Sequence, residues 1–92
     1  MDAHDLLQRM QRSPKSGWGQ DDIDRLLQGF GFTAKEGGKH RLYKHPKLPQ
    51  VRLTIARHND LAVGYVVDAV KAVRALLQID QEEADNVNKA NG

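Results

Sequence analysis

The residue best suited by its type to do chemistry is His40, which follows Gly38 and Lys39 in a strongly basic stretch of the sequence. Residues 33–58 contain seven Lys or Arg side chains and one acid, Glu36, so this segment carries a formal charge of +6. The rest of the chain carries −4, from seven Lys or Arg and eleven acids. Clustered positive charge favours a polyanionic partner. An imidazole within the cluster can transfer protons on that partner, because imidazole titrates near neutral pH.

Five cations around this histidine are predicted to bind phosphate groups of a nucleic acid. They are Lys39, Arg41, Lys44, Arg52 and Arg57. One of them could also stabilise the charge that develops on phosphorus during strand cleavage. The alternative interpretation is a solvated polar face that keeps a sheet from aggregating.

Cleavage also needs a second proton-transfer group, because one imidazole cannot be acid and base in a single concerted step. His45 and His58 are the candidates, with Lys39 or a water molecule as alternatives. A metal site built from the histidines and Asp60 is not expected, since the spacings match no standard ligand pattern. The predicted site therefore contains neither a metal ion nor a cofactor.

The composition predicts one domain with a mostly aliphatic core. The chain has 92 residues but only two Phe, two Tyr and one Trp. It has no cysteine, which excludes a disulfide, a thiolate nucleophile and a cysteine-ligated zinc site. No apolar run approaches the roughly 20 residues that cross a bilayer, and the first residues have no apolar leader pattern. We expect a soluble cytoplasmic protein without a membrane partner.

Hydrophobic periodicity predicts helices at both ends of the chain and strands between them. The predicted elements are a helix over 2–12, a second helix that begins near Gln20 or Asp21 and has stop signals at Gly29 and Gly31, strands over 33–36, 39–45 and 51–56, and a helix from about 61 to 77. Together they form a single domain over 1–79, and the polar residues 80–92 are predicted to be a disordered tail. This order predicts an α+β fold (α-α-β-β-β-α) in which a three-stranded antiparallel sheet packs on helices.

Strand alternation also predicts which side chains face the helices. In the third strand, Leu53 and Ile55 are expected on the buried face. In the second strand, Arg41, Tyr43 and His45 are expected on the exposed face. His40 would then lie with Leu42, near the seam between the sheet and the helices.

Several motifs, taken in order, resemble those of the HicA family, the small ribonuclease toxins of HicAB toxin–antitoxin pairs. The resemblance covers residues 6–77 and includes the valine-rich last helix. The matching pieces are Arg12-Ser13-Pro14-Lys15, Asp24-Arg25-Leu26-Leu27-Gln28-Gly29-Phe30-Gly31-Phe32, Gly38-Lys39-His40-Arg41-Leu42-Tyr43-Lys44-His45-Pro46 and Ile55-Ala56-Arg57-His58.

The resemblance implies a fold like that of double-stranded-RNA-binding domains and metal-independent cleavage of single-stranded, mRNA-like RNA. The family's Gly-Ser/Thr-His tripeptide contains its catalytic histidine, and it corresponds here to Gly38-Lys39-His40. His40 is therefore the implied catalytic residue, although a lysine replaces the hydroxyl residue. A HicB-like antitoxin is the implied protein partner.

The sequence thus predicts a toxin of the HicA type, an endoribonuclease (mRNA interferase) neutralised by its antitoxin. Two other interpretations stay open. A catalytically silent RNA-binding module of the same fold is favoured by the lysine in the tripeptide. A protein-interaction domain could instead use the basic face to dock an acidic partner. No oligomeric state is predicted.

Overall fold

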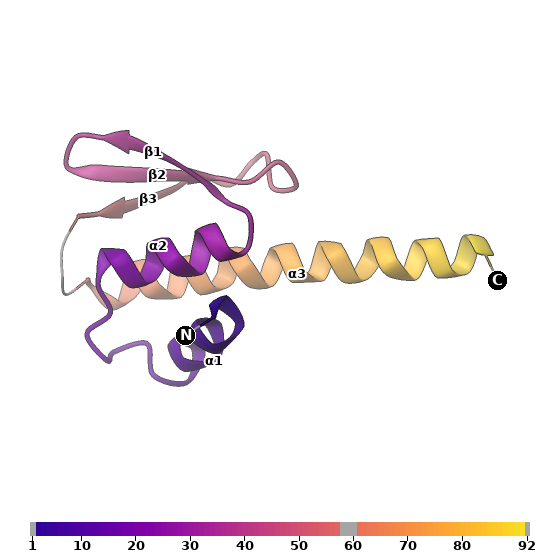
Figure 1. The fold of residues 1–92 in the computed structure, drawn as a ribbon, viewed down its shortest axis with the longest axis horizontal. Coiled ribbons are helices and arrows are strands. Elements are labelled where there is room, and N and C mark those ends of the chain that lie inside the picture. Colours follow the sequence, from indigo (N-terminus) through magenta and orange to yellow (C-terminus); the bar gives the residue numbers. More distant parts are fainter. Residues whose placement is uncertain (1, 58–60, 92) are drawn as a thin grey trace.

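A computed structural model describes residues 2–57 and 61–91, with side chains described through Asp85. These residues form three helices and one three-stranded antiparallel sheet (Figure 1). The elements are α1 (Ala3–Arg12), α2 (Gln20–Gly29), β1 (Thr33–Gly37), β2 (His40–Lys44), β3 (Leu53–Ala56) and α3 (Val63–Asn91). The predicted α+β fold and the predicted order of its elements are confirmed.

Both N-terminal helices begin at capped ends and bury an apolar stripe. The carboxylate of Asp2 accepts the backbone N–H of Asp5 at 2.9 Å and so satisfies one of the unpaired donors at the start of α1. At the start of α2 the bond runs the other way, and the carboxylate of Asp22 in the first turn accepts the N–H of Gly19, the residue before the helix, at 2.9 Å. Their buried side chains lie three or four residues apart, as one helical face requires. They are Leu6, Leu7 and Met10 in α1, and Ile23, Leu26 and Leu27 in α2.

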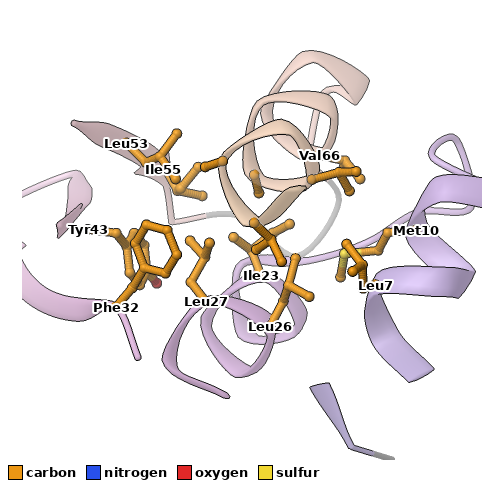
Figure 2. Packing of buried hydrophobic residues seen from close by; sticks show 14 of the residues in the cluster. Leu7, Met10, Ile23, Leu26, Leu27, Phe32, Tyr43, Leu53, Ile55 and Val66 are labelled. Carbon is orange, nitrogen blue, oxygen red and sulfur yellow. The ribbon is translucent and has the colours of Figure 1, made fainter. Parts of the chain in front are cut away.

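The sheet lies on one side of α2 and α3, and α1 packs on the other side of these two helices (Figure 1). Strand β2 is central, and β1 and β2 are joined by a tight turn in which Gly38 has a φ of 70°. Glycine adopts this conformation without steric penalty. The core fills the space between the layers, where Tyr43 and Phe32 lie beside Leu27 and Ile23 of α2 (Figure 2).

The predicted orientation of β2 is wrong. Arg41 and Tyr43 face the helices, and Tyr43 is fully buried. His40 is exposed on the opposite face, in the same phase as Leu42. The orientation is possible because α2 supplies Asp24, which accepts hydrogen bonds from both inward polar side chains. The predicted inward orientation of β3 through Leu53 and Ile55 is confirmed.

Helix α3 continues well past its predicted end at Leu77 and extends beyond the rest of the fold (Figure 1). The segment expected to be a disordered tail is helical through Asn91. Its first turn is held by Lys47, whose Nζ lies 2.6 Å from Asp80 Oδ1 and 2.9 Å from Glu83 Oε2. The division of the chain into a domain over 1–79 and a tail stays a prediction. None of the helices within the described residues has the length and apolarity to cross a membrane.

Candidate functional site

The face of the sheet turned away from α2 and α3, here called the outer face, carries His40 and a group of cations. Strand register places Lys35, His40 and Lys44 in one phase on this face. Arg52 comes just before β3 and two residues before Thr54, so strand alternation puts it on the same face as Thr54. The histidine and the three cations are all exposed. Within the described strands no residue in this phase is an acid, so the outer face is uniformly basic.

His40 is the first residue of β2 and lies at the end of the outer face nearest the turn. Its neighbours across the sheet are Gly37 on β1 and Ala56 on β3. Gly37 is exposed, Ala56 is buried, and His40 itself is exposed. Among the described side chains none makes a hydrogen bond to the His40 ring. The imidazole is therefore accessible to a substrate but is not held in one orientation by the protein.

Lys39 lies beside His40 in the turn, and its side chain is exposed. Its backbone carbonyl accepts the N–H of Arg57 at 3.2 Å. This bond ties the turn to the end of β3 and fixes the position from which Lys39 projects. Because Lys39 is exposed and directly precedes His40 in the chain, its long side chain can contact a phosphate that reaches His40.

Two of the five predicted phosphate-binding residues are paired with acids instead of lying on the outer face. The guanidinium of Arg41 donates from Nη1 to Asp24 Oδ1 at 2.8 Å. Its Nε lies 2.9 Å from Glu36 Oε1, although the N–H is not directed at that oxygen. Arg57 donates from Nη1 to Glu36 Oε2 at 2.8 Å. The structure thus separates these arginines from Lys39, Lys44 and Arg52, which are exposed and form no ion pair within the described residues.

Asp24 and Glu36 organise this part of the fold, and sequence reasoning gave them no role. Glu36 was detectable as the single acid of the basic segment. Asp24 carries no such signal, because it is one of several aspartates in α2. Asp24 accepts from Arg41, Tyr43 and Gln28, whereas Glu36 accepts from Arg57 and lies within ion-pair distance of Arg41. They therefore neutralise the charges that the strands place on the helix-facing side.

Tyr43 serves the fold and does not offer its ring to a ligand. Its hydroxyl donates to Asp24 at 2.7 Å and accepts from Gln20 Nε2 at 3.0 Å. Burial, with the hydrogen bond to Asp24, raises the pKa of Tyr43 to about 12. The phenol is therefore a neutral hydrogen-bond donor at physiological pH.

His45 lies at the other end of β2 from His40. His45 is five positions after His40, a distance of about 17 Å along an extended chain. The His45 ring packs edge-on against Phe32, with 5.0 Å between ring centroids, and its Nδ1 accepts the N–H of Lys47 at 3.0 Å. The structure therefore does not bring these two histidines together. His58, the other predicted acid–base candidate, lies outside the described residues.

The outer face combines an accessible imidazole with cations that can hold a phosphate backbone, which is an arrangement able to bind RNA and to move protons on it. Across residues 2–57 and 61–85, no three His, Cys, Asp or Glu side chains lie close enough together to share a metal ion. Neither the known protein families, nor the curated proteins, nor the solved structures contain a match to this chain.

Proposed function

We propose that this chain is a HicA-like toxin, a metal-independent endoribonuclease that cleaves single-stranded RNA such as mRNA in the cytoplasm. The observation that supports the proposal is the position of His40. It is exposed at one end of a basic face that lacks acids within the described strands, and Lys39 lies beside it. The ordered motifs of the sequence and the α-β-β-β-α core support the same assignment.

In the proposed reaction, a base removes the proton of a ribose 2′-hydroxyl, and the 2′-oxygen attacks the adjacent phosphorus. The bond from phosphorus to the 5′-oxygen breaks, and an acid protonates that oxygen. The products are a 2′,3′-cyclic phosphate and a 5′-hydroxyl. His40 acts as the base or the acid, and Lys39 stabilises the negative charge on the phosphoryl oxygens. Lys44 and Arg52 hold the RNA backbone further along the face.

The second proton-transfer group is open among Lys39, a water molecule and His58. His45 is disfavoured by its distance from His40 and by its contacts with Phe32 and the backbone of Lys47. A HicB-like antitoxin would inhibit the enzyme by covering the outer face with acidic side chains.

A catalytically silent RNA-binding module of the same fold is the second candidate function. It is favoured by the imidazole of His40, to which no described side chain makes a hydrogen bond. Efficient acid–base catalysts are usually held by such a partner. The lysine at the middle position of Gly38-Lys39-His40 removes the hydroxyl that could have served this purpose.

The decisive experiment compares wild type and His40→Ala on a long single-stranded RNA in the presence of EDTA. We expect wild type to produce 2′,3′-cyclic phosphate ends and the variant to cleave at least about 100-fold more slowly. RNA affinity and the circular dichroism spectrum should be unchanged, because the side chain is exposed. His45→Gln is the matched control and should retain cleavage.

Cleavage by His40→Ala at the wild-type rate would refute the catalytic assignment. If wild type binds the RNA without cleaving it, the silent module is the correct function. In that case Lys39→Ser, which restores the hydroxyl residue of the family motif, is the variant to test for recovered activity.

A further inference from the structure

One face of α3 carries opposite charges in its two halves. Lys71 and Arg74 lie in the half that packs in the fold, and Glu82 and Asp85 lie in the half that extends beyond it. With Gln78 between them, these five positions are three or four residues apart, so they share one face of the helix. All five side chains are exposed.

The charges are arranged symmetrically about Gln78. The cations lie seven and four residues before it, and the acids lie four and seven residues after it. When two copies of α3 run antiparallel with their Gln78 residues opposed, Lys71 faces Asp85 of the second copy and Arg74 faces Glu82. Each contact occurs twice, as in an isologous interface around a two-fold axis.

An apolar hollow lies where the second helix would run. Lys71 and Arg74 of α3 line the hollow together with Gln11 of α1. Its apolar surface comes from α1, from the loop after α1 and from α3 of the same chain. The apolar lining residues are Met10, Pro14, Val67 and Val70. Exposed ion pairs stabilise an interface only weakly, and the cover that the second helix gives to this hollow adds apolar burial to the affinity that the facing charges supply. The extended half of α3 is clear of the sheet and of α1, and a second copy can reach it (Figure 1).

The two acids that the pairing uses are available for it. Asp80 and Glu83 are bound to Lys47 of their own chain. By contrast, the described contacts of Glu82 and Asp85 are side-chain hydrogen bonds from glutamines one turn earlier on α3, at 3.3 and 3.2 Å. Lys47 therefore binds Asp80 and Glu83, and leaves Glu82 and Asp85 for the second copy.

We propose that this chain forms a homodimer in which two α3 helices pair antiparallel about Gln78. The hollow is on the α1 side of α3, whereas the sheet is on the other side (Figure 1). The outer faces of both copies therefore stay open. The dimer does not depend on the proposed ribonuclease function, and its test has no activity readout.

Sedimentation of the full chain tests the dimer, with wild type compared to K71E/R74E and to E82K/D85K. Wild type should be dimeric at low salt and dissociate as salt is raised. Each double variant opposes like charges in its own homodimer, so its dissociation constant should rise at least about tenfold. An equimolar mixture of the two variants should dimerise again, because every facing pair is then of opposite charge. K44E/R52E, on the outer face, is the control and should remain dimeric.

A wild type that is monomeric at about 0.1 mM, where even a weak specific dimer is populated, would overturn the proposal. So would a dimer that neither double variant weakens, or variants that fail to associate when mixed. Circular dichroism establishes that each variant is folded. If one double variant is unfolded, the dissociation constant of the other double variant is compared with that of wild type, and this comparison alone tests the proposal.

Discussion

At the scale of single residues, the contacts of Tyr43 explain how polar groups are accommodated between the sheet and the helices. Its ring is fully buried and its hydroxyl bonds to Asp24 and Gln20. Asp24 also binds Arg41, so a single carboxylate satisfies two inward-facing side chains of β2. When one of these two donors is removed, the other stays bound to Asp24, and this limits the expected loss of folding free energy.

Replacing Tyr43 with phenylalanine should lower the free energy of unfolding by about 1 kcal/mol at pH 7, the usual contribution of one hydrogen bond. The variant should also change the pH dependence. A tyrosine in the unfolded chain ionises near pH 10, whereas the pKa of Tyr43 in the fold is about 12. The folded state therefore holds its proton more tightly, and this stabilisation is complete below pH 10 and lost as pH rises to 12.

Urea unfolding at several pH values measures this effect as a difference between the two proteins. Wild type should lose up to about 2 kcal/mol more than Tyr43→Phe between pH 10 and pH 12. Tyr65 and the lysines are present in both proteins, so their contributions cancel in the difference. Parallel profiles would mean that burial and Asp24 do not perturb the phenol.

At the scale of elements, the close approach of α1 to α2 depends on the absence of a side chain at Gly29. A Cβ added at this position would lie 2.5 Å from Cβ of Ala3, well inside van der Waals contact. Gly64 in α3 is a natural comparison, since a Cβ there has no neighbour within 4 Å among the described residues. The two glycines thus differ in packing while both lie in helices.

Gly29→Ala should therefore destabilise the fold by about 1–3 kcal/mol, because the added methyl group forces α1 away from α2. Gly64→Ala should leave stability unchanged or raise it by up to about 1 kcal/mol, since alanine is the better helix former. Urea denaturation of both variants gives the comparison. Equal shifts for the two variants would show that the α1–α2 contact adjusts without cost.

How far the elements could be predicted depended on how cleanly polar and apolar residues alternate. In β3, Leu53 and Ile55 are large apolar residues, whereas Arg52, Thr54 and Ala56 are polar or small, so the buried face was predicted correctly. In β2, one face carries His40, Leu42 and Lys44 and the other carries Arg41 and Tyr43, so each face mixes polar residues with one apolar or amphipathic residue. The choice between Leu42 and Tyr43 as the inward residue depends on Asp24, which is distant in sequence. Local pattern carries no information on such a partner.

Partners that are distant in sequence also explain why the end of α3 and the pairing of the basic residues were not predicted. Polar residues after Leu77 have little to bury, and the sequence alone does not reveal that Lys47 reaches Asp80 from 33 residues away. The basic character of the segment was visible in the sequence. Which of its cations are paired with acids depends on Glu36 for Arg41 and Arg57 and on α3 for Lys47.

At the scale of the whole molecule, the small net charge of +2 conceals two basic surfaces on opposite sides of the fold. One is the outer face of the sheet, and the other lies along α1 and α3, where Arg12 and Lys71 are exposed. An RNA that bound through net charge alone would not distinguish these surfaces. An RNA that is positioned for cleavage at His40 must lie along the outer face.

The salt dependence of RNA binding separates these two cases. For single strands, the logarithm of the binding constant falls with the logarithm of salt concentration by about 0.7 for each phosphate contact. Lys44→Ala and Arg52→Ala should each reduce the slope by about 0.7, and Arg12→Ala, on α1, should leave it unchanged. Fluorescence anisotropy with a short labelled RNA gives the slopes. If Arg12→Ala changes the slope and the outer-face variants do not, the RNA binds on the helical side, where His40 cannot reach it.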